Sequence, residues 1–246
     1  KILEINAKSG MYPLLAAYNV YTRKLKNVHH KSEDEVAKQL WSEVLENNIY
    51  VLCKSPMAKS ITERTLTGYN QGIKTNIVYI ENLVEKLQQK GKFKGYALKN
   101  ELLAKFKLDT SMKFKAVVGN PPYQINTETN FATPVYHLFI EAAKSLKPDY
   151  VSLIHPARFL FNAGATPKDW NKQMLNDPHL SVPMYEPDSQ KIFSGVDIKG
   201  GVCITLWDKN NPGGGLGGKF YAYDELRTIH EKANEGGLDK IVSPAG

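Results

Sequence analysis

The sequence is poor in cysteine and has no long apolar run. Its 246 residues include only two cysteines, Cys53 and Cys203, and both lie in apolar, strand-like stretches. Two cysteines without a CxxC pair exclude a disulfide framework and indicate a reducing compartment, the cytoplasm, with both thiols in the core. No apolar stretch approaches the ~18 residues of a membrane helix, and the first ten residues lack the pattern of a signal peptide. We therefore expect no membrane partner.

The histidines also lack the spacing of metal ligands. Neither CxxC nor a spaced His pair occurs among the two cysteines and the six histidines, which are His29, His30, His137, His155, His179 and His230. We therefore expect no metal site.

Acidic residues are in deficit. The chain has 32 Lys and Arg against 25 Asp and Glu, a formal charge of +7. Residues 86–115 hold nine lysines but only Glu101 and Asp109 as acidic residues. Such an excess favours a polyanionic partner, most simply nucleic acid. From charge alone, a solvated lysine-rich face is an equally good interpretation.

Short apolar runs alternate with helical patterns along the chain. The runs at 2–5, 49–53, 76–80, 115–119 and 150–154 predict strands, and two more are expected near 180–186 and 201–207. Helices are expected at 11–25, 32–48, 55–66, 81–91, 98–108, 134–146 and 170–177, the second of them opened by a Ser32–Glu35 capping box. This alternation indicates an α/β fold with a mostly parallel sheet that is covered on both faces.

The expected domain organisation follows from the same pattern. Residues 1–210 are predicted to form one catalytic domain, with a basic helical insertion at about 84–113 and a polar loop at 124–133. The glycine-rich stretch 211–218 predicts a linker. Residues 219–233 predict a strand and a helix that begin a following segment, 211–246. Because the sequence begins at Lys1 inside a strand-like run, we interpret it as a fragment.

One turn has a pattern that suggests chemistry. The apolar run VVG is followed directly by Asn120, Pro121, Pro122 and Tyr123. The prolines fix φ and make the turn stiff. The Asn120 side-chain oxygen and the Pro121 carbonyl could therefore accept both N–H bonds of one planar NH₂ group, which makes its nitrogen more nucleophilic. Tyr123 could stack on the ring that carries this amine.

AVVGNPPYQ resembles the catalytic motif of class I S-adenosylmethionine-dependent amino-methyltransferases, especially N6-adenine DNA methyltransferases of restriction–modification systems. The resemblance covers about residues 2–207, including ILEINAKSGMYPL (2–14), the stretch from 135 to 160 and IFSGVDIKGGVCITLW (192–207). It implies a Rossmann-like three-layer α-β-α fold whose seven-stranded sheet has one antiparallel strand. It also implies S-adenosylmethionine as cofactor, double-stranded DNA as partner, and further restriction–modification domains or subunits, with the recognition domain absent from this sequence.

The resemblance also implies roles for individual residues. The catalytic turn would be Asn120, Pro121, Pro122 and Tyr123, and Phe193 would join Tyr123 in stacking on a flipped adenine. The cofactor would be bound by residues in or after the first, third and fourth strands, namely Glu4, Asn6, Ser9, Gly10, Glu81, Asn82 and Asn120.

The cofactor side departs from the family pattern at two places. Lys8 replaces a family glycine, which adds a Cβ and a positive charge near a cationic sulfonium. Cys53 and Lys54 stand where the family has an acidic residue that holds the ribose hydroxyls.

Two alternatives stay open, the first because of these departures and the second because the NPPY motif also occurs in methyltransferases with other substrates. One is a non-catalytic methyltransferase-like module that binds DNA or a partner subunit. The other is an NPPY methyltransferase that acts on protein glutamine or on RNA.

Overall fold

A seven-stranded sheet forms the centre of the molecule. The computed structural model describes residues 1–26, 33–88, 96–126, 132–213 and 215–235. The strands of the main sheet are β1 (Ile2–Ala7), β2 (Ile49–Cys53), β3 (Asn76–Tyr79), β4 (Ala116–Gly119), β7 (Tyr150–Pro156), β8 (Leu180–Glu186) and β9 (Val202–Asp208). They lie in the order β3-β2-β1-β4-β7-β9-β8. The first five are parallel, whereas β9 runs antiparallel to both of its neighbours. The predicted fold class is therefore confirmed.

Helices connect these strands. They are α1 (Met11–Leu25), α2 (Glu33–Asn47), α3 (Pro56–Thr67), α4 (Leu83–Gln88), α5 (Tyr96–Lys105), α6 (Tyr136–Ser145), α7 (Lys168–Asn176) and α8 (Asp224–Glu235), with short 3₁₀ turns η1 (Arg158–Phe161) and η2 (Ser189–Lys191). The start of α3 has the contacts that its sequence predicts for a helix N-terminus. Ser55 accepts a hydrogen bond from the Ala58 N–H at 3.1 Å, and Pro56 occupies the first turn, where no donor is needed. Ser32 of the predicted capping box lies outside the described residues.

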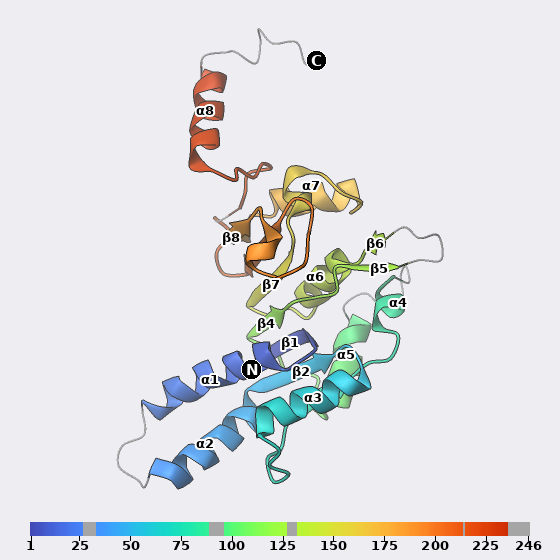
Figure 1. The fold of residues 1–246 in the computed structure, drawn as a ribbon, viewed down its shortest axis with the longest axis vertical. Coiled ribbons are helices and arrows are strands. Elements are labelled where there is room, and N and C mark those ends of the chain that lie inside the picture. Colours follow the sequence, from blue (N-terminus) through green and yellow to red (C-terminus); the bar gives the residue numbers. More distant parts are fainter. Residues whose placement is uncertain (27–32, 89–95, 127–131, 214, 236–246) are drawn as a thin grey trace.

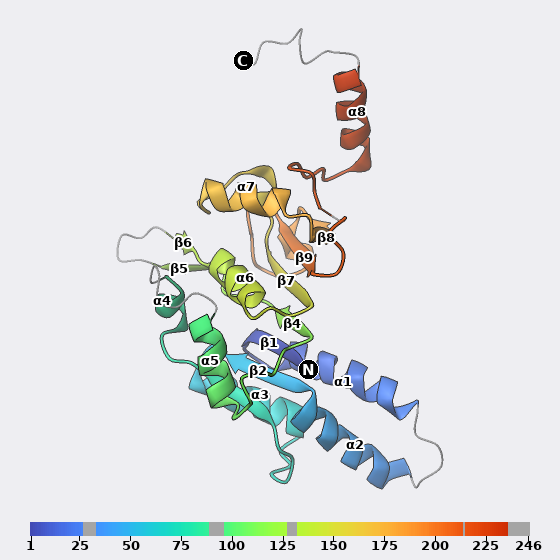
Figure 2. The same ribbon diagram turned by 180° about the vertical axis from the view of Figure 1, so that it is seen from behind.

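Two hydrophobic cores show that helices cover both faces of the sheet. One core contains residues of α1, α2 and α3, such as Ala17, Val44 and Leu66. The other contains residues of α5, α6 and α7. Successive side chains of β2 alternate between them, with Val51 in the first core and Leu52 in the second. In Figures 1 and 2, α1, α2 and α3 lie together beside β1 and β2, whereas α8 projects at the opposite end.

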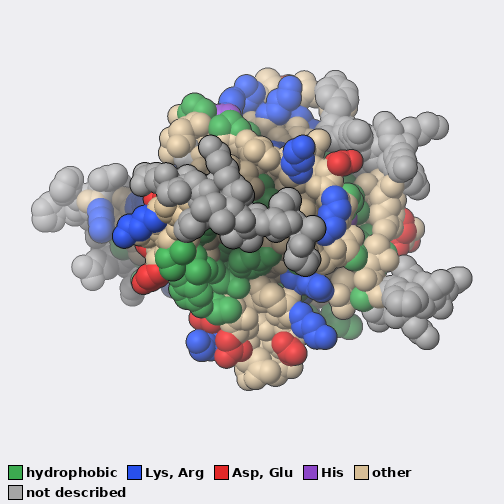
Figure 3. All heavy atoms as spheres, turned by 90° about the horizontal axis from the view of Figure 1, so that it is seen from above, with side chains coloured by type: hydrophobic (Ala, Val, Ile, Leu, Met, Phe, Trp, Pro, Cys, Tyr) green, Lys and Arg blue, Asp and Glu red, His purple; other side chains and the backbone are tan. Residues whose placement is uncertain are grey.

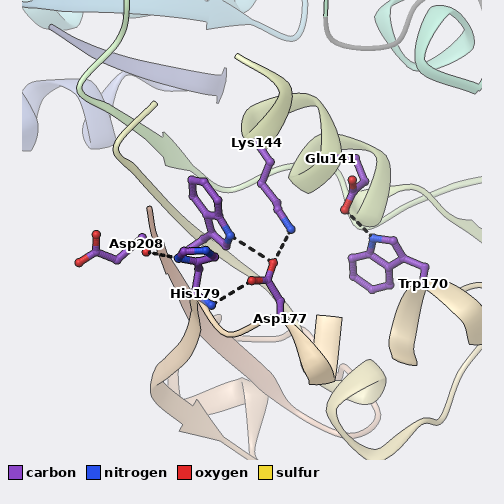
Figure 4. A network of polar contacts seen from close by, with 7 residues as sticks. Glu141, Lys144, Trp170, Asp177, His179 and Asp208 are labelled. Carbon is purple, nitrogen blue, oxygen red and sulfur yellow. Dashed lines mark hydrogen bonds and ion pairs between the residues drawn. The ribbon is translucent and has the colours of Figure 1, made fainter. Parts of the chain in front are cut away.

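A polar network joins the antiparallel strands to α6. Asp177, which follows α7, accepts hydrogen bonds from Lys144 Nζ at 2.7 Å and from Trp207 Nε1 at 3.1 Å. The same carboxylate accepts the His179 N–H at 2.9 Å. Figure 4 shows Asp177 between Lys144 on α6 and His179 at the start of β8. One carboxylate thus holds α6, β8 and β9 in register.

Two predicted elements differ in the structure. A polar loop was expected at 124–133. In the structure, its first residues form β5 (Gln124–Asn126), which pairs antiparallel with β6 (Ala132–Pro134). Ile125 on this hairpin packs against the core, which favours an extended conformation. The strand expected within 219–223 does not form in that described stretch. Phe220 instead contacts the rings of Phe161 and Tyr185, at centroid distances of 5.7 and 5.5 Å.

The basic segment is also more than an exposed insertion. Its apolar side chains Leu98, Leu102, Phe106 and Phe114 are buried in the core that includes α6. Among its described lysines, Lys105, Lys107, Lys113 and Lys115 are exposed, so this part of the segment covers the sheet with its apolar side chains. Lys86 forms an ion pair with Glu101 at 3.0 Å.

Candidate active site

The NPPY turn and the loop after the first strand meet at one edge of the sheet. Because β1 and β4 are parallel neighbours, with Glu4 opposite Val118, the loops that follow them emerge side by side. The Asn6 side-chain Nδ2 donates a hydrogen bond to the Asn120 backbone oxygen at 2.7 Å. The structure therefore brings the two loops into direct contact, as the parallel topology predicts.

The NPPY turn is anchored on both sides. Asn6 binds the Asn120 carbonyl, and the Val135 N–H donates to the Tyr123 carbonyl at 3.0 Å. Apart from its approach to the Tyr123 hydroxyl, the Asn120 side-chain amide has no hydrogen-bond partner among the described residues. Its oxygen is therefore available to a ligand.

Glycine is required at position 119 because β4 approaches β1 closely there. Its φ is +146°, and a Cβ at this position would lie 2.8 Å from Glu4 Oε1. Any other residue would clash with the carboxyl group or displace the turn. Glycine at the end of β4 thus allows Asn120 to sit next to the first strand.

Tyr123 and Phe193 lie together beside the turn. Their ring centroids are 6.4 Å apart and their planes are inclined by 63°. Phe193 is positioned by the turn η2, since its N–H donates to the Ser189 oxygen at 2.8 Å. Burial raises the pKa of the Tyr123 hydroxyl, and the nearby Asn120 side chain offsets this only in part. The hydroxyl is enclosed without a partner in hydrogen-bonding geometry among the described residues. Tyr123 is therefore neutral and presents its ring face.

Glu4 lies under the loop and not on its surface. Its side chain is 2 % exposed. Burial raises the pKa of its carboxyl group to about 8, against the opposing effects of the Asn6 N–H and of the Lys8 charge. One oxygen accepts the Asn6 N–H at 3.3 Å, and the other has no partner among the described residues. Glu4 is therefore protonated at neutral pH and can act as a hydrogen-bond donor.

The loop itself is shaped by glycine and held by α3. Gly10 has φ +82°, and a Cβ there would lie 3.0 Å from the Cα of Thr62 and from the Cβ of Thr65. Thr65 Oγ1 also donates to the Ser9 carbonyl at 2.7 Å. Lys8 is exposed beside it, and its pKa is lowered by partial burial and by the charge of Lys54.

The ends of β2 and β3 differ in what they offer a cofactor. Cys53 is buried, its thiol lies 3.8 Å from Thr62 Oγ1, and burial raises its pKa to about 11. Lys54 is exposed, so the end of β2 supplies a cation where a ribose would need acceptors. After β3, Glu81 and Asn82 are both exposed, and Asn82 has φ +51° at the entry to α4. Of these two strand ends, the one after β3 therefore carries the exposed hydrogen-bond acceptors.

A cavity of about 450 Å³ borders the turn on the Tyr123 side. It is lined by residues of five segments, namely Tyr123, Gln124, Ala132, Pro134, Tyr136, Pro156, Arg158, Ala165, Thr166, Val196, Asp197, Ile198 and Lys199. Sequence reasoning did not identify Tyr136, Arg158 or Lys199, because each is an ordinary residue in its own segment. The structure places Gly164 and Gly200, both with positive φ, next to Arg158, and this proximity is not visible in the sequence.

Positive charge does not gather in a single patch on the face of the molecule seen from above. On the face seen in Figure 3, Lys and Arg side chains are spread around the outline, with Asp and Glu between them. The described residues contain no group of three His, Cys, Asp or Glu side chains that could hold a metal ion. Within the same described ranges, every helix is too short or too polar to cross a lipid bilayer.

Solved structures share this fold. The EcoKI M protein of a type I restriction enzyme aligns with 89 % of this chain and 42 % of its own, at 13 % identity and a TM-score of 0.51. The type ISP restriction-modification enzyme LlaGI, a nuclease-deletion mutant in complex with a DNA substrate mimic, aligns with 85 % of this chain and 23 % of its own, at 11 % identity and a TM-score of 0.58. At these identities the similarity shows a common fold.

Sequence comparison identifies the family. An uncharacterized adenine-specific methylase of Mycoplasma pneumoniae is 29 % identical over 106 residues, which cover 42 % of this chain. The aligned region spans only 25 % of that relative. The family profile described as Eco57I restriction-modification methylase matches residues 47–193, more than half of the chain. The chain therefore belongs to the Eco57I restriction-modification methylase family.

Proposed function

We propose that this chain carries the catalytic site of an S-adenosylmethionine-dependent methyltransferase that modifies N6 of adenine in double-stranded DNA. The observation that supports this most strongly is the geometry of the NPPY turn. Asn120 has its backbone oxygen bound by Asn6 and its side-chain oxygen available, and Tyr123 lies beside Phe193. An amine and its ring would thus find acceptors and an aromatic contact in one place.

The Asn120 side-chain oxygen and the Pro121 carbonyl would accept the two N–H bonds of the adenine amine. This pairing favours a tetrahedral nitrogen whose lone pair is no longer delocalised into the ring. Because the turn is fixed before substrate arrives, the acceptors need no reorganisation during the reaction. The amine loses its proton during or after attack, so the site requires no strongly basic side chain.

Adenine N6 cannot be reached inside a duplex, so the base would leave the stack and enter the site. Tyr123 and Phe193 are inclined rings 6.4 Å apart. A base held between two parallel ring faces needs about 3.5–4 Å on each side, or ~7–8 Å in total. The Phe193 ring would therefore turn and move outward by about 1 Å when the base enters.

Two features of the chain do not favour S-adenosylmethionine, namely the exposed Lys8 in the loop after β1 and the end of β2. Ser9 and Gly10 at the start of α1, together with Glu81 and Asn82 after β3, would hold the cofactor, which supplies an electrophilic methyl group when bound. Glu4 and Asn6 would contribute indirectly, since Glu4 is 2 % exposed and Asn6 Nδ2 is bound to Asn120. The ribose hydroxyls would find no carboxylate at Cys53 and Lys54, so we expect weaker cofactor binding than an acidic residue would give.

These two features favour one alternative function, a non-catalytic module that binds DNA or a partner subunit. Calorimetric titration of S-adenosylmethionine into the protein separates the two. The catalytic proposal predicts binding, and predicts that Lys54→Asp strengthens it because the new carboxylate can accept the ribose hydroxyls. If neither the wild-type protein nor Lys54→Asp binds the cofactor, the catalytic proposal is wrong.

A further inference from the structure

Arg158 is the most prominent charged group in the cavity beside the NPPY turn. It begins η1 directly after β7, is exposed, and lines the cavity together with Tyr123. No ion pair neutralises its guanidinium in the described part of the chain. An unneutralised guanidinium in a concave site favours an anionic ligand.

Two glycines make room for the Arg158 side chain. A Cβ on Gly200 would lie 2.7 Å from Arg158 Cγ, and a Cβ on Gly164 would lie 3.4 Å from Arg158 Cβ and Nε. Both glycines have positive φ, +85° and +84° respectively. The side chain is thus held between two backbone segments and is not free as a typical surface arginine is. A held guanidinium loses less conformational entropy when it binds a ligand.

The cavity continues directly from the aromatic pair. Tyr123 contributes to both, and the segment that carries Phe193 runs on to Asp197 and Lys199 on the cavity wall. A nucleobase between Tyr123 and Phe193 would therefore place its sugar and phosphate in or near this cavity. The cavity wall carries two positive side chains, Arg158 and Lys199, and one negative side chain, Asp197, so its net charge is +1.

We propose that Arg158, assisted by Lys199, binds the phosphodiester that adjoins the flipped adenosine. This inference rests on the proposed function, because it takes the adenine position from the NPPY turn. The guanidinium would bind two phosphate oxygens in a bidentate manner, which a lysine cannot do. It would fix the nucleotide by its backbone without reading sequence.

The test uses a short single strand, since an unpaired base enters the site without the cost of unstacking a duplex. The probe is a fluorescein-labelled TTTATTT heptanucleotide, and its binding to the protein is measured by fluorescence anisotropy without cofactor. Two further probes carry an uncharged methylphosphonate on the 5′ or the 3′ side of the adenosine. Arg158→Gln is compared with Arg64→Gln, which removes an exposed arginine on α3 outside the cavity.

We expect Arg158→Gln to weaken binding of the normal probe about tenfold, as loss of a charge-assisted bond does, and Arg64→Gln to change it less than about twofold. One of the methylphosphonates should weaken wild-type binding similarly but leave Arg158→Gln nearly unchanged, because the two changes remove the same contact. Arg158→Lys should keep most of the salt dependence and lose part of the affinity. Circular dichroism would establish that each variant is folded.

Three results would overturn the proposal. They are no binding of the heptanucleotide by the wild-type protein, equal affinities of Arg158→Gln and Arg64→Gln, and a methylphosphonate penalty that persists in Arg158→Gln. Because binding is measured without methyl transfer, a phosphate contact without methylation would contradict only the proposed function. If the protein methylates DNA but Arg158→Gln binds the heptanucleotide as tightly as the wild type does, only the phosphate contact is contradicted.

Discussion

Replacing Glu4 by Gln should remove a pH-dependent destabilisation of the folded protein. The pKa of this buried carboxyl group rises from an ordinary 4.5 to about 8 on folding. Between these values the folded state holds a proton that the unfolded state has released, so stability is full below about pH 4.5 and falls as the pH rises toward 8. Each pH unit corresponds to about 1.4 kcal/mol. The wild-type protein should therefore lose roughly 3 kcal/mol between pH 4.5 and 7 relative to Glu4→Gln.

Urea unfolding at several pH values between 4.5 and 8 measures this difference. Glu4→Gln itself buries an amide whose second donor lacks a partner, which costs about 1–3 kcal/mol at every pH. That constant offset leaves the slope unaffected, so the slope is the quantity to compare. Glu63→Gln, an exposed position on α3, should run parallel to the wild type. If the Glu4→Gln and wild-type curves are also parallel, Glu4 is not a buried neutral acid.

Three further predictions concern the turn, the aromatic pair and the polar network. Asn6→Ala should lower kcat for methylation at least tenfold while changing the cofactor Kd by less than about threefold, because Asn6 Nδ2 binds the Asn120 backbone oxygen in the wild type. Equal effects on kcat and on the cofactor Kd would place Asn6 in the cofactor site. Phe193→Ala should weaken binding of an adenine-containing strand about tenfold, as loss of a stacking contact does, with calorimetry showing unchanged cofactor binding; the reverse outcome would remove Phe193 from the base site. Asp177→Asn should destabilise the protein by about 1–3 kcal/mol at pH 7 in urea unfolding. Burial alone would raise the pKa of Asp177, but its bonds to Lys144 and other donors hold it below the usual 3.8. This contribution is therefore present above pH 3.8 and lost as the pH falls below that value, and a difference that stays constant as the pH falls would contradict the ion pair.

The sheet and the NPPY turn could be predicted because both depend on local sequence. Apolar runs between helical patterns are visible in short windows, and parallel topology then places Asn120 beside the loop after the first strand. The pairing of β5 with β6 was missed because each strand has three residues, of which Ile125 packs against the core. The burial of the basic segment was missed because Leu98, Leu102 and Phe106, which are spaced by four residues, lie among many lysines.

The finer design of the site depends on contacts between distant residues. Asn6 was assigned to the cofactor, whereas the structure shows its side chain bound to Asn120, which lies 114 residues away in the sequence. Glu4 was expected at a strand end, but neighbouring strands enclose it and change its protonation state. Arg158 becomes notable only when Gly200 and the cavity are seen around it. None of these features leaves a periodic or local signal.

Nucleoside analysis of methylated DNA tests the central proposal most directly. Double-stranded DNA is incubated with the protein and S-adenosylmethionine carrying an isotopically labelled methyl group, digested to nucleosides and analysed by mass spectrometry. The proposal predicts label in N6-methyladenosine of the wild-type sample and at least a hundredfold less with Asn120→Ala, because one preorganised acceptor is lost. Label on cytosine, or undiminished adenine methylation by Asn120→Ala, would contradict the assignment of the NPPY turn to the adenine amine.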